Sequence, residues 1–185
     1  MGTPAIPKPV RFFVSLLYRA EGQTSEAEQR LRDLLGDILS RTAPEPFLHT
    51  TYYEREMGKG LLRHFLLFED LRNREDLIRI KLRTNDMESD LAGAVRRSIN
   101  IDPGYLALEQ VVLATTKGYA HRIYLGQGIF GDLTLIYTDG TYKPLPWTYP
   151  DYGGTELITL FNGWRDQYKI EVRRNPGLGK TSKIE

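Results

Sequence analysis

The chain has 185 residues, a length that favours one domain with a sizeable core. Its 25 basic and 24 acidic side chains nearly cancel, which argues against a dedicated DNA or anionic-membrane surface but allows a local basic patch. Cysteine is absent, so disulfides and thiolate metal sites are excluded. The first residues lack the apolar block of a signal peptide, and no apolar run is long enough for a spanning helix. We therefore expect a cytoplasmic protein without a membrane partner.

The first hundred residues alternate between strand and helix patterns. Val10–Tyr18 is apolar at odd and even positions alike, as in a central strand covered on both faces. In chain order we expect a strand at Val10–Tyr18, a helix at Ser25–Leu39, strands at Phe47–Tyr53 and Leu61–Phe68, a helix at Asn73–Leu91 and a short strand at Arg97–Ile101. This β-α-β-β-α-β order is the ferredoxin-like order.

Turn signals divide the rest of the chain. Asp102-Pro103-Gly104 is expected to form a turn with proline at its first central position. Asp139-Gly140 tolerates the positive φ of a two-residue hairpin turn, so we expect it to join Ile129–Thr138 to Thr141–Pro146. The other expected elements are strands at Leu108–Thr115 and His121–Leu125 and a last helix at about Thr155–Val172.

Together these elements predict an α+β fold. It is a mostly antiparallel sheet with helices packed on it, in ferredoxin-like order, extended by a C-terminal β-hairpin and helix. Residues 8–173 are expected to form a single domain, with flexible tails at 1–7 and 174–185.

Two motifs with known chemistry are present only in part. Gly177–Thr181 (GLGKT) ends like a phosphate-binding loop, but Arg174 stands where the first glycine is required and no strand precedes it. A solvated tail is the better interpretation. His49-Thr50-Thr51 fits one half of the paired His-x-Thr signature of certain phosphoesterases, but the chain lacks a second copy. We therefore expect His49 to be a hydrogen-bonded strand residue.

Metal binding has little support. The three histidines are scattered, without a spacing typical of metal ligands. Asp86, Glu88 and Asp90 would spread round a helix and are expected to form a solvated face. Neither a metal nor a cofactor is predicted.

The most distinctive polar cluster is Thr115–Tyr124 (TTKGYAHRIY), which lies between apolar strand-like segments. Lys117, His121 and Arg122, with the hydroxyl of Thr116, have the chemistry to bind a phosphate or carboxylate. If the segment is a strand, however, His121 and Arg122 face opposite sides and the three basic groups do not converge. Lys117 is then a plain loop lysine.

Arg122 also has a structural alternative. Its guanidinium could pair with the carboxylate of Asp132 or with that of Asp102. In that case its charge would be neutralised within the protein, and it would not be an anion ligand.

A second distinctive segment is Leu145–Tyr152 (LPWTYPDY), which is rich in aromatic residues and proline. Its aromatic rings could form a stacking wall for a nucleotide base, and Tyr149 would then shape the site. The favoured alternative is that Trp147 and Tyr149 cover the sheet edge while the prolines block further strand pairing.

Six strings of the sequence carry a family resemblance. They are Lys8-Pro9-Val10, Tyr52-Tyr53-Glu54-x-Glu56-Met57-Gly58, Asp102-Pro103-Gly104-Tyr105-Leu106, Leu113-Ala114-Thr115-Thr116-Lys117, Ala120-His121-Arg122-Ile123-Tyr124-Leu125 and Leu145-Pro146-Trp147-Thr148-Tyr149-Pro150-Asp151-Tyr152. In these strings the chain resembles the uncharacterised bacterial family called domain of unknown function 4416. The resemblance implies a small bacterial cytosolic protein of one domain, without agreed catalytic residues. Members are sometimes labelled GTP-binding, but this chain lacks both a P-loop and an Asn-Lys-x-Asp motif.

The leading functional hypothesis is a binding protein for a small anionic ligand, namely a nucleotide or another phosphate-bearing metabolite. The expected ligand-binding residues are Thr116, Lys117, His121, Arg122 and Tyr149. The second hypothesis is a phosphoester-directed hydrolase in which His121 acts as general acid or base beside Asp102 or Asp151. The third is an interaction module for a protein or RNA partner that uses residues 145–152. A DNA partner is not expected.

Overall fold

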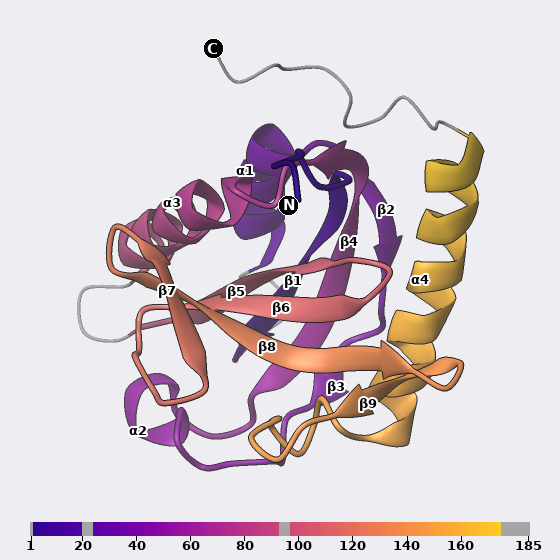
Figure 1. The fold of residues 1–185 in the computed structure, drawn as a ribbon. Helices are drawn as coiled ribbons and strands as arrows, with labels where there is room; N and C mark the ends of the chain where they lie inside the picture. The colour runs from indigo at the N-terminus through magenta and orange to yellow at the C-terminus, as the bar shows by residue number, and fades with distance from the viewer. Residues whose placement is uncertain (1, 20–23, 93–96, 175–185) are drawn as a thin grey trace.

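The computed structural model describes residues 2–19, 24–92 and 97–174. Within these ranges nine strands form one sheet and four helices accompany it (Figure 1). In chain order the elements are β1 (Val10–Tyr18), α1 (Thr24–Leu35), β2 (Ile38–Arg41), β3 (Glu45–Pro46), α2 (Glu54–Met57), β4 (Leu62–Arg72), α3 (Asp76–Asp90), β5 (Ile99–Leu106), β6 (Gln110–Thr115), β7 (Arg122–Gly126), β8 (Ile129–Thr138), β9 (Thr141–Pro144) and α4 (Thr155–Arg174). The tail motif Gly177–Thr181 lies outside the described residues.

The strand order in the sheet is β2-β4-β1-β5-β6-β8-β7, with β3 paired to β4 and β9 paired to β8. All the described pairings are antiparallel. The predicted α+β class with a mostly antiparallel sheet is therefore confirmed. The ferredoxin-like order stays a prediction, because the sheet has nine strands and the expected unit would be only part of it.

Strand β1 lies at the centre and has a core on each face. All nine of its residues are buried, as its continuous apolar run predicts. Phe12, Val14 and Leu16 face a core that includes side chains of α1 and α3, whereas Phe13 faces a second core with α4. Figure 1 shows the same three layers, with α1 and α3 on one side of the sheet and α4 on the other. The alternation follows from the two-residue repeat of a strand.

Two expected elements near the N-terminus differ from the structure. The first helix ends at Leu35 rather than Leu39, because Gly36 takes a φ of +91° and Ile38 pairs with Phe68 in the sheet. The strand expected at Phe47–Tyr53 is wrong. Only Glu45–Pro46 pairs with β4, and the chain then turns into the short helix α2.

The turn expected at Asp102-Pro103-Gly104 is also wrong, because these residues continue β5. Pro103 lies opposite Val14 of β1, and the pairing of β5 with β6 begins only at Gly104. Proline has no backbone N–H to donate to a neighbouring strand. Because Pro103 precedes the first residue of β5 that pairs with β6, this pairing loses no hydrogen bond. Asp102 is thus held within a strand at the end of the sheet.

The C-terminal extension follows the sequence closely. Asp139 and Gly140 have φ of 50° and 82° and connect β8 to β9, as a two-residue hairpin requires. Helix α4 packs on the second core and is fastened to β1: the Tyr168 hydroxyl donates to the Pro9 carbonyl at 2.8 Å, and Arg11 pairs with Glu171.

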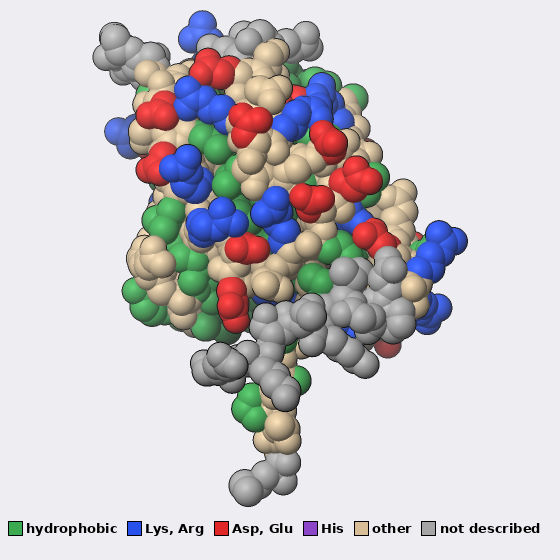
Figure 2. All heavy atoms as spheres, turned by 90° about the horizontal axis from the view of Figure 1, so that it is seen from above, with side chains coloured by type: hydrophobic (Ala, Val, Ile, Leu, Met, Phe, Trp, Pro, Cys, Tyr) green, Lys and Arg blue, Asp and Glu red, His purple; other side chains and the backbone are tan. Residues whose placement is uncertain are grey.

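The surface seen from above in Figure 2 carries lysine and arginine side chains interspersed with aspartate and glutamate. Ion pairs link such groups on α1 and α3: Arg30 contacts Glu26 at 2.6 Å and Asp90 at 2.9 Å. This face therefore has no single sign of charge, in agreement with the near-zero net charge. No helix in the described residues is long and apolar enough to cross a membrane.

Candidate functional site

The predicted site residues gather at one end of the sheet. Here β1 and β6 end and β4 and β5 begin, because neighbouring strands are antiparallel. The loop after β6 and residues 147–151 meet there with the segment that leads into α2. We call the region formed by these three segments and the first residues of β5 the loop cluster.

Lys117 is exposed in the loop after β6. Its Nζ donates a hydrogen bond to the Tyr52 hydroxyl at 2.7 Å and lies 4.6 Å from the centre of that ring. The hydrogen bond to Tyr52 is the main cause that raises the pKa of Lys117. The lysine therefore keeps its charge and presents it at the surface. Thr116 beside it is exposed as well.

Arg122, the first residue of β7, holds the loop in place. Its Nε donates to Asp132 at 2.8 Å, one terminal nitrogen to the Lys117 carbonyl at 3.0 Å and the other to the Tyr149 hydroxyl at 3.1 Å. Its side chain is only 4% exposed. Pairing with Asp132, one of the two predicted alternatives, is thereby confirmed. Arg122 fixes the positions of Lys117 and Tyr149 and is already occupied by protein groups.

His121 stands in an aromatic stack. The ring centres of Tyr119 and Trp147 lie 6.1 and 5.3 Å from it, with interplanar angles of 14° and 16°. Its Nε2 lies 3.5 Å from Asp132, the carboxylate that also binds Arg122. The strand that would set His121 and Arg122 on opposite faces does not include His121, because β7 begins at Arg122 and His121 belongs to the preceding turn.

Trp147 and Tyr149 fit the favoured structural interpretation in part. The indole N–H of Trp147 donates to the Leu133 carbonyl at 2.8 Å, so the ring covers β8. Yet Trp147 remains 38% exposed and Tyr149 52% exposed, so both present ring surface to solvent. They can therefore fasten the segment and still contact a ligand.

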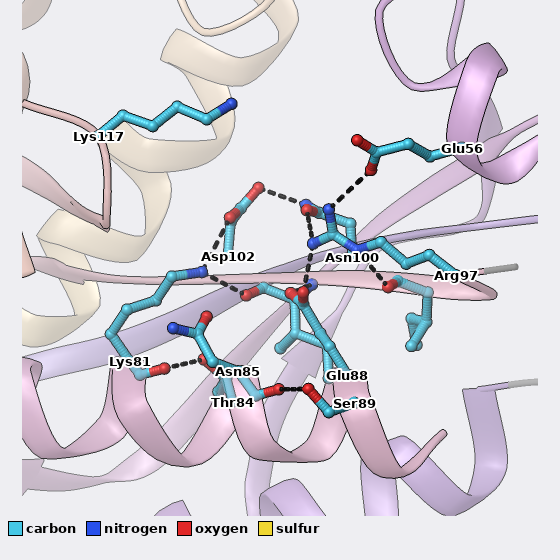
Figure 3. Close-up of polar contacts among 12 residues, drawn as sticks. Glu56, Lys81, Thr84, Asn85, Glu88, Ser89, Arg97, Asn100, Asp102 and Lys117 are labelled. Atoms are coloured by element: carbon cyan, nitrogen blue, oxygen red, sulfur yellow. Dashed lines mark hydrogen bonds and ion pairs between the residues drawn. The ribbon is translucent and has the colours of Figure 1, made fainter. Parts of the chain in front are cut away.

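A partly buried polar network lies beside the loop cluster, where α3 packs on β5 (Figure 3). We define the polar network as Glu56, Lys81, Glu88, Arg97, Asn100 and Asp102. Asp102 is its most informative member: one carboxylate oxygen accepts from Lys81 Nζ at 3.3 Å and the other from Asn100 Nδ2 at 2.5 Å. Lys81 also donates to the Ile101 carbonyl at 3.1 Å. The Asp102 carboxylate is thus held in one orientation.

The rest of the polar network surrounds Arg97. This guanidinium pairs with Glu88, donates to Asn100 Oδ1 at 2.5 Å and lies 3.4 Å from Glu56. The other oxygen of Glu88 accepts the backbone N–H of Ile101 at 2.6 Å. Burial is the main cause that raises the pKa of Glu88.

Sequence reasoning missed most of the polar network. Glu88 was expected on a solvated helix face together with Asp86 and Asp90, but it is buried, and only the other two are exposed. Lys81 was not considered at all, although it follows Leu77 by four residues and so lies on the same helix face. A charged residue on an otherwise apolar face was the signal available.

Asp151 has different partners from Asp102. It pairs with Arg63, whose guanidinium lies 4.9 Å from the ring centre of Phe65 and 5.0 Å from that of Phe47. Asp151, Arg63 and Phe65 border a hollow of about 440 Å³ at the start of α4, which His49 also lines. His49 is exposed and outside a strand, so its expected strand position was wrong.

The described residues contain no group of three or more histidine, aspartate or glutamate side chains placed to hold a metal ion. Acidic groups in and beside the loop cluster instead contact basic side chains, as Asp132 does with Arg122 and Asp102 with Lys81. The arrangement is suited to recognising charged and hydrogen-bonding groups of a ligand.

Comparison with known proteins identifies the family. The model of the domain of unknown function 4416 (DUF4416) matches residues 8–168. The chain belongs to this family, as the six strings of the sequence indicated. A search of curated proteins and a search of solved structures each found no match.

Proposed function

We propose that the protein binds a small anionic ligand, a nucleotide or another phosphate-bearing metabolite, at the loop cluster. Lys117 supplies the charge contact, Thr116 a hydroxyl, and Tyr149 and His121 the walls. Arg122 positions the loop through its own hydrogen bonds rather than contacting the ligand with a free edge.

The charge state of Lys117 is the observation that carries this proposal. Four basic side chains of this region pair with carboxylates: Lys81 with Asp102, Arg97 with Glu88, Arg63 with Asp151 and Arg122 with Asp132. Among the described contacts of this region, the amino group of Lys117 instead meets the neutral hydroxyl of Tyr52. An anion would therefore gain a charge-assisted hydrogen bond from Lys117 without first breaking an ion pair.

Exposed aromatic rings beside Lys117 favour a ligand that also has a flat group. Tyr52 is 54% exposed and Tyr119 61% exposed. Trp147 and Tyr149 of the segment 147–151 are exposed as well. Rings of this kind stack on nucleobases with little dependence on sequence. A nucleotide has both a phosphate, which Lys117 can bind, and a flat base, which the aromatic rings of the loop cluster can stack on.

Thermal unfolding with a panel of nucleotides, phosphorylated metabolites and inorganic phosphate tests the proposal. A ligand at about 100 times its dissociation constant adds roughly 2.7 kcal/mol to the free energy of unfolding, which raises the midpoint by roughly 5–11 °C at this chain length. We expect Lys117→Ala to abolish the shift. Lys143→Ala is the matched control, because Lys143 lies in the β8–β9 hairpin, far from α2 in Figure 1. A flat panel with the wild-type protein would reject the proposal and favour a protein or RNA partner.

The hydrolase alternative takes a more specific form in the structure. His121 contacts Asp132, whereas Asp102 and Asp151 bind Lys81 and Arg63. A role for His121 as acid or base would therefore use Asp132 to orient the ring. Release of phosphate from the ligand that stabilises the protein is the measurement that would favour this alternative.

Two finer expectations belong to the same proposal. We place the protein in the cytoplasm of a bacterium, as the family resemblance implies. We also propose that the strands in the order β2-β4-β1-β5 form a ferredoxin-like unit, to which β6, β8, β7 and β9 add a further half of the sheet.

A further inference from the structure

We infer that the ligand of the loop cluster carries a vicinal diol, as ribose phosphates do, and that Asp102 accepts the hydrogen bonds of its two hydroxyl groups. The inference rests on the proposed function, because it assigns the part of the ligand that lies away from Lys117. It makes Asp102 a specificity-determining residue.

The geometry of the Asp102 carboxylate defines what it can bind. A carboxylate has about four lone-pair positions, two on each oxygen. Lys81 occupies a position on one oxygen and Asn100 a position on the other. Each oxygen therefore retains acceptor capacity, and the pair matches two donors held side by side. The hydroxyls of a ribose are such donors, and carboxylates bind them in dinucleotide-binding folds.

The burial of the partners shows that the carboxylate is presented and not enclosed. Lys81 is 5% exposed and Asn100 5% exposed, whereas the side chain of Asp102 is 34% exposed. The two donors thus hold the carboxylate from the protein side and leave its outer side open. A fixed acceptor loses less conformational entropy when it binds a ligand than a mobile surface side chain does.

The contacts of Asp102 suit neutral donors. Lys81 already balances the charge of the Asp102 carboxylate, and Arg97 is balanced by Glu88 and Glu56. Hydroxyl groups fill the remaining acceptor positions of the carboxylate without adding a charge to this balanced set. A diol supplies two such donors.

Lys117 and Asp102 lie on two sides of a tyrosine pair. Lys117 donates to the Tyr52 hydroxyl, and the rings of Tyr52 and Tyr53 pack with their centres 5.2 Å apart. Burial raises the pKa of the Tyr53 hydroxyl, and the negative charge of Asp102 raises it further. In the view of Figure 3 the side chain of Lys117 extends from its loop toward the side on which the carboxylate of Asp102 lies.

Titration calorimetry with three probes tests the inference: adenosine monophosphate, its 2′,3′-dideoxy counterpart and inorganic phosphate. We expect the wild-type protein to bind the ribonucleotide roughly 10- to 100-fold more tightly than the dideoxy nucleotide, because hydrogen bonds to a charged group are lost. In Asp102→Asn this ratio should fall close to one, while the dideoxy nucleotide binds as it does to the wild type. Lys117→Ala should weaken binding of all three probes.

The possible results separate the two claims. If both nucleotides and phosphate bind the wild type but the ribonucleotide has no advantage, the diol inference is rejected and the anion site stands. If none of the three binds, the proposed function fails and the inference fails with it. The comparison of two nucleotides on the wild-type protein does not depend on the folding of a variant, so an unfolded Asp102→Asn would leave the test intact.

Discussion

Gly104 is enclosed by the two strands that flank β5 and by the core beneath them. A Cβ at this position would lie 2.7 Å from the ring of Phe13 and 2.7 Å from the backbone carbonyl oxygen of Val112. The ring could turn, but the carbonyl belongs to the paired strand β6. We therefore expect Gly104→Ala to lower the free energy of unfolding by about 1–3 kcal/mol, the usual cost of overpacking. Urea denaturation would measure it, and an unchanged value would show that β5 and β6 can separate at this point.

Single residues of the site show how far the sequence could lead. The pairing of Arg122 with Asp132 was one of two alternatives derived from charge alone, and the register of β7 on β8 places the two residues opposite each other. The partners of Asp102 could not be derived in that way. Its contact with Lys81 depends on how α3 lies on β5, which no local pattern encodes.

Among the elements, the helices and the C-terminal hairpin were the most predictable. Their signals are local, because a helix needs an apolar stripe and the hairpin needs two residues that tolerate positive φ. The expected strand at Phe47–Tyr53 had suitable residue types but pairs with β4 only before it, at Glu45–Pro46. Strand propensity describes a half-buried surface, and in this segment the chain does not provide a neighbouring strand.

Helix α4 contains a glycine that the structure does not require. Gly163 is exposed in the interior of the helix, and a Cβ there would have nothing within 4 Å. We expect Gly163→Ala to raise the free energy of unfolding by up to ~1 kcal/mol, because alanine loses less backbone entropy in a helix. Chemical denaturation of Gly163→Ala and Gly104→Ala in parallel measures both changes. The same substitution should raise the free energy of unfolding at position 163 and lower it at position 104. A destabilised Gly163→Ala would indicate that α4 bends at this glycine.

For the molecule as a whole, the response to acid should depend on a buried histidine. His64 of β4 is 2% exposed; its Nδ1 lies 2.9 Å from the Tyr18 hydroxyl and its Nε2 3.3 Å from Glu28. Burial, followed by the charge of Arg41, lowers the pKa of His64 from 6.5 to about 4. Arg41 also pairs with Glu28, which offsets the attraction of that carboxylate for a protonated ring.

The sign of the pH effect follows from proton binding. Between pH 6.5 and about 4 the unfolded chain protonates this histidine and the folded chain does not, so stability falls as the pH falls. We expect His64 to account for a loss of about 3 kcal/mol over that range and for no loss above it. Denaturation curves at pH 7, 5.5 and 4.5 should therefore show a smaller pH dependence for His64→Gln than for the wild type. Equal dependence would mean that His64 has the same pKa in the folded and the unfolded chain, with the charge of Glu28 offsetting the effect of burial.

The convergence of the site is a property of the whole sheet. Segments near residues 52, 102, 117 and 149 come together because antiparallel strands bring several ends to one side. Strand order was the part of the fold that local patterns could not supply. The strings that carry the family resemblance include the segments of the loop cluster, but they do not indicate that these segments meet in space.

The bond between the first strand and the last helix has a consequence for synthesis on the ribosome. Phe13, Phe65 and Leu67 complete their core only with Phe161, Trp164 and Tyr168 of α4. Arg11 likewise finds its carboxylate partner at Glu171. Until those late residues emerge from the exit tunnel, one broad apolar face of the growing sheet stays bare. The nascent chain therefore cannot complete this core before α4 has been made, and we expect its need for a chaperone to last until that helix has emerged.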